Sequence, residues 1–220
     1  MWRSGKYLAV ALVMMLATAS ASDASRSGRQ SPGCSPLPSR VLTVDARAKV
    51  YQVTGTLVRG CEIPGTGKIF GRVRGSRRAY LLEAAPFGTT EGIGGLASLT
   101  LAGTTVAYEN YFEDFGPGAP RTNMMEVRNL RTGRLIHRVP MIAHEYESPP
   151  DPGSATTVLK PDGAVAWIVL NAGEYEVHVV DRAGSRVLAV GSDIEPHSLT
   201  LDASKLHWTQ GGEPMSASLS

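Results

Sequence analysis

The stretch LTLDASKLHW (residues 199–208) consists of two short runs of alternating apolar and polar residues on either side of a polar turn. Alternation of this kind around a short turn is typical of a β-hairpin. Similar stretches occur three times earlier in the chain: LTVDARAKVY (42–51), LTLAGTTVAY (99–108) and VLKPDGAVAW (158–167). The sequence therefore predicts four hairpins, and each of them ends on a tyrosine or a tryptophan.

A second stretch follows the first in three of the four repeats: TLVRGCEIPGTGKIFGRV (56–73), EVRNLRTGRLIHRV (126–139) and EVHVVDRAGSRVLAV (176–190). Each again indicates strand, turn and strand, so a repeat is expected to hold four antiparallel strands. The last repeat ends at Ser220 and has residues for three strands only. The predicted fold class is therefore all-β, a β-propeller-like array of about four antiparallel four-stranded blades with the last one incomplete.

The repeats resemble the blades of bacterial propeller-type repeat proteins, and residues 40–220 as a whole resemble exported proteins built in this way. The Gly-His and Trp-Asp pairs of the WD-repeat family are absent, because Trp167 precedes Ile168 and Trp208 precedes Thr209. The resemblance therefore implies a propeller-like fold and transfers no catalytic residue to this chain.

The aromatic residues that close the hairpins are expected in the core. Because a large flat ring fills the space between two blades, we predict that all four pack between neighbouring sheets. They are Tyr51, Tyr108, Trp167 and Trp208. The alternative is that such a ring stacks on a sugar. We also expect the N-terminal segment to complete the last blade and close the ring, because an open strand edge favours aggregation.

The N-terminus has the composition of a signal peptide, predicted over residues 1–21. Arg3 and Lys6 precede an apolar run at 8–19, and small residues follow at the expected cleavage site. A run of about 12 residues is too short to span a bilayer, which needs roughly 20. We therefore expect a secreted or extracytoplasmic protein with no membrane span after cleavage, in which a Ser/Pro-rich spacer at 22–39 precedes the 40–220 domain.

Charge and cysteine content narrow the possible partners. The chain has 22 Lys and Arg and 20 Asp and Glu, and two of the basic residues lie in the leader. A near-neutral exported chain argues against nucleic acid as a partner, because phosphate binding needs a basic excess.

Cys34 and Cys61 are expected to form a disulfide, as two cysteines in an exported chain most simply do. Two free or metal-binding thiols are the alternative.

One end of the predicted sheets is expected to carry the long connections 84–95, 109–123 and 143–155. These connections are rich in carboxylates and aromatic rings, whereas the short turns at the other end are basic. Binding residues commonly lie on loops held by a rigid frame. The candidate binding residues are Tyr111, Phe112, Glu113, Asp114, His144, Glu145, Tyr146 and Glu147. The alternative is that these charges are ordinary solvated turns.

Three functions fit such a face. The first is a non-catalytic binding or scaffold protein whose partner is a protein, peptide or glycan in the cell envelope or outside the cell. The second is a glycosidase-like hydrolase that uses two carboxylates as acid and base. Its candidate residues are Glu109, Glu113, Asp114, Glu145 and Glu147. The third is a scaffold stabilised by Ca²⁺, because hard oxygen ligands cluster there; no other cofactor or metal is expected.

Overall fold

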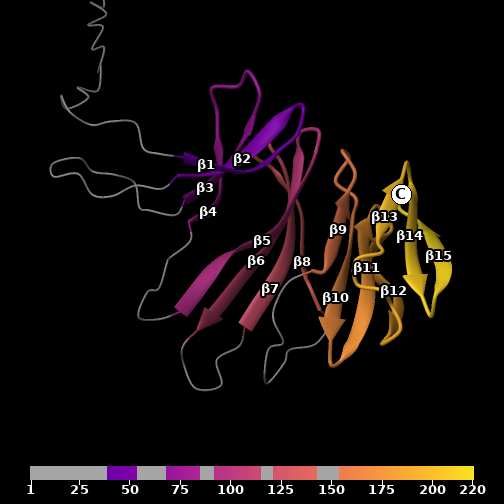
Figure 1. Cartoon of the computed structure of the whole chain (residues 1–220). Coiled ribbons are helices and arrows are strands. Elements are labelled where there is room, and N and C mark those ends of the chain that lie inside the picture. The colour runs from indigo at the N-terminus through magenta and orange to yellow at the C-terminus, as the bar shows by residue number, and fades with distance from the viewer. Residues whose placement is uncertain (1–38, 54–67, 85–91, 115–120, 143–153) are drawn as a thin grey trace, which may run out of the picture. The chain divides into compact units, whose positions relative to one another are not determined.

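A computed structural model describes residues 39–53, 68–84, 92–114, 121–142 and 154–220. Within these ranges the chain forms fifteen β-strands and no helix, so the all-β prediction is confirmed. The strands build four antiparallel sheets in chain order (Figure 1). Three sheets have four described strands and the last has three, as expected from the number of strands that the last repeat predicts.

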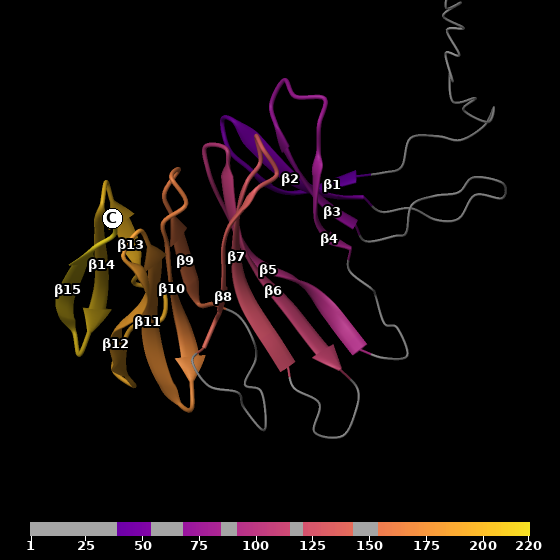
Figure 2. The same cartoon turned by 180° about the vertical axis from the view of Figure 1, so that it is seen from behind.

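Sheet A contains β1 (Ser39–Val44), β2 (Ala48–Val53), β3 (Lys68–Val73) and β4 (Tyr80–Ala84). Sheet B contains β5 (Gly92–Ala102), β6 (Thr105–Asp114), β7 (Arg121–Asn129) and β8 (Leu135–Pro140). Sheet C contains β9 (Thr156–Leu159), β10 (Val165–Asn171), β11 (Glu174–Asp181) and β12 (Gly184–Gly191). Sheet D contains β13 (Thr200–Asp202), β14 (Lys205–Gln210) and β15 (Glu213–Ser218). Within each sheet, strands that are consecutive in the sequence lie side by side (Figure 2).

The four predicted hairpins are β1–β2, β5–β6, β9–β10 and β13–β14. The second hairpin of the first repeat differs from the prediction. Residues 68–73 form β3, which pairs with β2 on one side and with β4 on the other. The strand predicted at 68–73 is therefore confirmed, but its predicted hairpin partner is wrong, since the basic turn RGSRR at 74–78 follows β3 and leads to β4. The first half of the predicted hairpin lies outside the described residues.

The two short turns of a sheet lie at the same end, as an up-and-down order of strands requires. In sheet A the amide of Arg74 donates to the carbonyl of Arg47 at 2.8 Å. In sheet B the amide of Leu130 donates to the carbonyl of Thr104 at 2.7 Å. Main-chain hydrogen bonds thus connect the first and second hairpins of each of these sheets.

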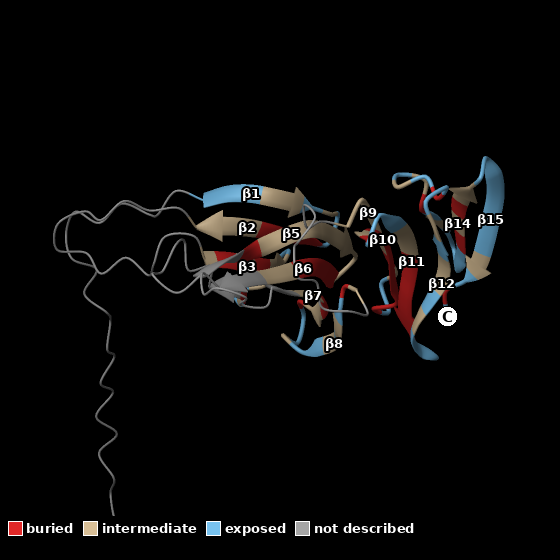
Figure 3. Ribbon diagram, turned by 90° about the horizontal axis from the view of Figure 1, so that it is seen from below, coloured by how far each residue is buried: buried red, intermediate tan, exposed pale blue. Residues whose placement is uncertain are grey.

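Three apolar clusters lie between successive sheets. The first joins sheets A and B and includes Val50 and Tyr108. The second joins sheets B and C through Met125 and Trp167, and the third joins sheets C and D. Strand β10 contributes to two of them, so its sequence VAWIVLN is apolar almost throughout, as expected for a strand buried on both faces. Figure 3 shows buried residues along β11 and exposed ones on β1 and β15.

The aromatic residues follow the prediction in three sheets and not in the first. Tyr108 and Trp167 are completely buried and Trp208 is 5% exposed, each in the cluster shared with the preceding sheet. Tyr51 is only half-buried, and none of the three described clusters includes it. The expectation that Tyr51 packs between sheets is wrong, because no described sheet precedes sheet A.

The predicted leader, the spacer, Cys34 and Cys61 lie outside the described residues. The disulfide therefore stays a prediction, to be checked by mass mapping of the exported chain without reduction. Within the described ranges, no helix is long and apolar enough to cross a membrane.

Candidate functional site

The acidic segment predicted as a long connection at 109–123 is mostly strand. Strand β6 continues to Asp114 and β7 begins at Arg121. The aromatic residues Tyr111 and Phe112 favour this extension, since aromatic side chains are common in strands. The prediction of a loop over 109–123 is therefore wrong for residues 109–114 and 121–123. These residues favour the extended conformation and pair across the β6–β7 hairpin.

The predicted connection 84–95 is shorter than expected for the same reason. Strand β5 begins at Gly92, and its register places Gly92 opposite Asp114 and Gly95 opposite Tyr111. A Cβ atom on Gly95 would come within 2.7 Å of the hydroxyl oxygen of Tyr111. Glycine therefore lets this half-buried ring lie across the neighbouring strand.

Glu109, a candidate acid or base of the hydrolase hypothesis, is completely buried. Its Oε2 accepts a hydrogen bond of 3.2 Å from the amide of Ser154, just before β9. The hydroxyl of Ser98, in a bulge of β5, donates to the carbonyl of Ser154 at 3.4 Å. Glu109 therefore links sheet B to the start of sheet C, and its predicted place on an exposed acidic face is wrong.

The other candidate residues lie beyond what the structure describes. The backbone places Phe112, Glu113 and Asp114 at the end of β6, but their side chains are outside the described set. Residues 143–153, with His144, Glu145, Tyr146 and Glu147, are outside the described ranges altogether. In the part of the chain that is described, no three His, Cys, Asp or Glu side chains form a group that could hold a metal ion.

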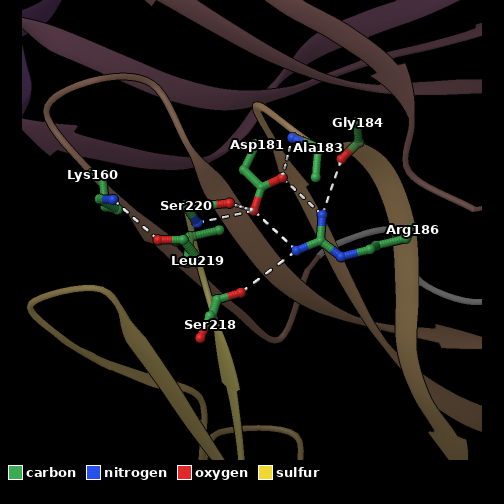
Figure 4. Close-up of polar contacts among 8 residues, drawn as sticks. All are labelled: Lys160, Asp181, Ala183, Gly184, Arg186, Ser218, Leu219 and Ser220. Carbon is green, nitrogen blue, oxygen red and sulfur yellow. Dashed lines mark hydrogen bonds and ion pairs between the residues drawn. The ribbon is translucent and has the colours of Figure 1, made fainter.

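A polar cluster at the short-turn end of sheet C attaches the C-terminus (Figure 4). The buried carboxylate of Asp181 accepts bonds of 2.7 and 2.9 Å from Arg186, and further bonds from the amide and hydroxyl of Ser220. Lys160 donates to the carbonyl of Leu219 at 3.0 Å. These hydrogen bonds lower the pKa of Asp181 far below its ordinary value, and the contact with Arg186 contributes most. Every group in the cluster bonds to another, so its role is to anchor the chain end.

The outer face of sheet A, defined as the face opposite the cluster shared with sheet B, carries a continuous apolar row across all four strands. The register pairs Val41 with Tyr51, Tyr51 with Phe70, and Phe70 with Leu81. Directly paired residues of antiparallel strands project from the same face. The rings of Tyr51 and Phe70 stack at 5.9 Å between centroids. We call these four residues the apolar row.

The apolar row is exposed at both ends. Val41 is 50% exposed and Leu81 is 45% exposed. Val44, which is 58% exposed, pairs with Lys49 in the adjacent row, and Lys49 in turn pairs with Arg72. An exposed group of large apolar side chains on a sheet typically marks an interaction surface.

Sheet A is also strongly basic. Residues 39–53 and 68–84 contain eight basic and two acidic residues. The basic ones are Arg40, Arg47, Lys49, Lys68, Arg72, Arg74, Arg77 and Arg78, and the acidic ones are Asp45 and Glu83. By contrast, residues 154–220 contain four basic and eight acidic residues. The net charge of the whole chain is therefore close to zero because the basic residues of sheet A are offset by the acidic residues of 154–220.

The cations of sheet A lie beside the apolar row and at the adjoining turns. The ammonium nitrogen of Lys49 lies 5.2 Å from the ring centroid of Tyr51. Arg74, Arg77 and Arg78 are exposed in the turn between β3 and β4. The outer face of sheet A thus combines aliphatic side chains, two stacked rings and a basic border.

The sequence contains a signal for this face. In AKVYQV (48–53) and KIFGRV (68–73), apolar residues stand at odd and at even positions, so both faces of these strands carry them. Such a pattern is typical of a strand whose sheet is covered on both faces. Comparisons with known proteins add nothing to this surface, because no family model, curated protein or solved structure matches the chain.

Proposed function

We propose that the protein is an exported, non-catalytic binding or scaffold protein, and that the outer face of sheet A is a binding surface. The observation that carries this proposal is the position of Tyr51. Its counterparts Tyr108, Trp167 and Trp208 are each covered by the preceding sheet, whereas Tyr51 lies on an exposed apolar row. In sheets B, C and D the face that carries this aromatic residue packs against the preceding sheet. The corresponding face of sheet A is therefore available to bind a partner.

The proposal is tested by changing the exposed edge of this face. Val41→Glu with Val44→Glu adds two carboxylates to edge strand β1 without touching the core. The matched control is Val187→Glu with Val190→Glu, because these valines are 43% and 49% exposed and lie three positions apart on β12, the edge strand of sheet C. The chain is expressed with its own leader in a bacterium that exports it, and the cell envelope and the medium are separated.

The parent and the control pair are expected to stay with the cell envelope, and the Val41/Val44 pair is expected to be released into the medium. Circular dichroism of each purified chain checks that the fold is unchanged. Equal distribution of the two pairs would contradict the use of this face.

The predicted face around Glu113 and Asp114 remains a second candidate surface of the same protein. If these carboxylates lie on an exposed face as predicted, Glu113→Ala with Asp114→Ala should leave the melting temperature nearly unchanged, since exposed carboxylates contribute little to stability. A rise in melting temperature on adding Ca²⁺, lost in this pair, would favour the calcium-stabilised scaffold instead. Turnover of a glycan that is lost in the pair would favour the hydrolase.

The arrangement of the four sheets as an open array of propeller-like blades also belongs to this proposal. It is supported by the uniform order of strands and by the short turns at one end of each sheet. Ring closure would bring sheet D onto the outer face of sheet A and cover it. A chemical cross-link between Lys49 and Lys205 within one chain would demonstrate such closure and would contradict the proposed binding surface.

A further inference from the structure

We propose that the partner of the outer face of sheet A is the surface of a membrane rich in anionic phospholipid. This inference rests on the proposed function and specifies its partner. It combines the apolar row with the cations of the neighbouring row and of the turn between β3 and β4. A protein that binds a membrane from outside typically uses buried apolar area together with electrostatic attraction to anionic headgroups.

The apolar contribution comes from side chains that are exposed in the protein. Val41, Val44 and Leu81 are each about half exposed, so half of their surface remains to be transferred from water. Tyr51 and Phe70 lie between them and are half-buried. Aromatic rings with a polar tip are common at the interface between water and lipid. The row therefore presents one apolar line with its ends free to enter the headgroup region.

The electrostatic contribution comes from the border. Lys49 and Arg72 form the row next to the apolar row, and the exposed Arg74, Arg77 and Arg78 follow in the adjoining turn. A basic side chain near an anionic bilayer increases binding by roughly fivefold. Long basic side chains can keep their charge among headgroups while their methylenes lie along apolar surface.

A second copy of the chain fits this face less well. If two copies packed through their apolar rows, Lys49, Lys68 and Arg72 of one copy would face the same cations of the other. Sheet D of a second copy is also unsuitable, because its outward positions are polar except for Pro214. The polar ones are Thr200, Asp202, Lys205, His207, Thr209, Ser216 and Ser218, as the register with the buried Leu206 and Trp208 shows.

Single-stranded nucleic acid also fits less well, although sheet A is basic. Binding of bases requires free ring faces on which they can stack. The rings of Tyr51 and Phe70 stack on each other, and Lys49 lies over Tyr51. The exposed ends of the row, Val41 and Leu81, are aliphatic and offer neither a ring nor a hydrogen bond.

The experiment measures co-sedimentation of the exported chain, after removal of its leader, with two kinds of vesicle. One kind contains phosphatidylglycerol and phosphatidylcholine in equal parts, and the other contains phosphatidylcholine alone. We expect binding to the first kind, little binding to the second, and weaker binding at high salt because salt screens the charges. Equal binding to both kinds, or none to the first, would overturn the proposal.

Two variant pairs separate the two contributions. Val41→Glu with Val44→Glu, and Arg77→Gln with Arg78→Gln, are each expected to weaken binding by about tenfold or more. The matched controls are Val187→Glu with Val190→Glu on sheet C, and Arg182→Gln with Lys205→Gln, which also removes two positive charges but on sheets C and D. The arginine pair lies in an exposed turn, so it keeps the test valid if the valine pair folds poorly. Controls that lose as much binding as the test pairs would overturn the proposal.

Different results would contradict the binding surface and the assignment of anionic lipid as its partner. If the Val41/Val44 pair is released from the cell envelope but the parent does not bind anionic vesicles, the binding surface stands and the lipid assignment is wrong. A parent that sediments as a dimer, with the dimer lost in the Val41/Val44 pair, would assign the face to a second copy. Tight binding of an oligonucleotide that depends on Arg77 and Arg78 and competes with vesicles would assign it to nucleic acid.

Discussion

The carboxylate of Asp181 holds the guanidinium of Arg186 through two hydrogen bonds of 2.7 and 2.9 Å, and the same carboxylate accepts two bonds from Ser220 (Figure 4). One buried side chain of sheet C thus fixes both the following strand β12 and the end of the chain after β15. Sheet D has only three strands, and this cluster supplies a polar attachment in addition to its apolar contact with sheet C.

Asp181→Asn is expected to lower the free energy of unfolding by about 2 kcal/mol, because the amide replaces a charge-assisted pair and places an NH₂ group among donors. Urea unfolding followed by tryptophan fluorescence measures the change. Asp202→Asn serves as a control, since Asp202 is exposed on sheet D, and it should change stability very little.

The same pair predicts a pH dependence. The contact with Arg186 lowers the pKa of Asp181 in the folded protein, so the folded state binds a proton less readily than the unfolded state. The stabilisation is therefore fully present above the ordinary carboxyl pKa of about 4 and decreases as the pH falls below it. The difference in stability between the parent and Asp181→Asn should be constant from neutral pH to about pH 5 and shrink in more acidic solution. A difference that grows on acidification would contradict this assignment.

A second polar contact is buried between sheets A and B. The hydroxyl of Tyr108 donates to Glu126 at 2.7 Å and accepts from Arg128 at 2.8 Å. Burial raises the pKa of Tyr108, and the nearby Glu126 carboxylate adds to the effect. Tyr108→Phe leaves the ring in place but removes one donor from a buried carboxylate, so we expect a loss of about 1–3 kcal/mol in urea unfolding. A neutral result would mean that the remaining partners of Glu126, which are Asn110, Arg128 and Arg138, satisfy its carboxylate.

The hairpins could be predicted from sequence, whereas the burial of their faces could not. Alternation within LTLDASKLHW involves neighbours in the chain, and it correctly indicates β13, its turn and β14. Whether Tyr51 or Glu109 is buried depends on the sheet that packs against its own sheet. The spacing of apolar residues within one hairpin does not predict which sheet packs there. Trp208 and Tyr51 therefore occupy the same position in two similar hairpins, yet Trp208 is buried in a core and Tyr51 lies on a surface.

The candidate site shows the same division. The acidic character of 109–114 is visible in the sequence, but the extension of β6 to Asp114 follows from cross-strand pairing with β5 and β7. The basic excess of sheet A is visible only once residues 39–53 and 68–84 are known to form one sheet. Summed over the whole chain, that excess is offset by the acidic residues of 154–220.

Truncation of the repeated aromatic residues should separate the covered positions from the uncovered one. Trp208→Ala is expected to destabilise the protein by about 3–5 kcal/mol, because a nearly buried ring leaves a cavity between sheets C and D. Tyr51→Ala should cost about 1 kcal/mol, since the ring is half-buried and makes one stacking contact with Phe70. Both values come from chemical denaturation, and equal costs would contradict the different environments described for the two rings.

The two-residue turns of β5–β6 and β13–β14 are equivalent, yet their first residues differ. Gly103 has φ of +65°, and Ala203 occupies the same place with φ of +52°. A main-chain bond from a buried leucine follows each turn, from Leu130 to Thr104 and from Leu219 to Ser204. Ala203 is thus in a left-handed conformation, which costs an L-residue roughly 1–2 kcal/mol.

Ala203→Gly should therefore stabilise the protein by about 0.5–1 kcal/mol, since relief of this strain exceeds the entropy that glycine gains in the unfolded chain. The matched control is Ala183→Gly, because Ala183 lies in the β11–β12 turn without a positive φ. That substitution keeps the amide that donates to Asp181 and should destabilise the protein by a similar amount. Urea midpoints of the two variants should thus move in opposite directions from the parent. A shift of both in the same direction would show that the turn of sheet D carries no strain.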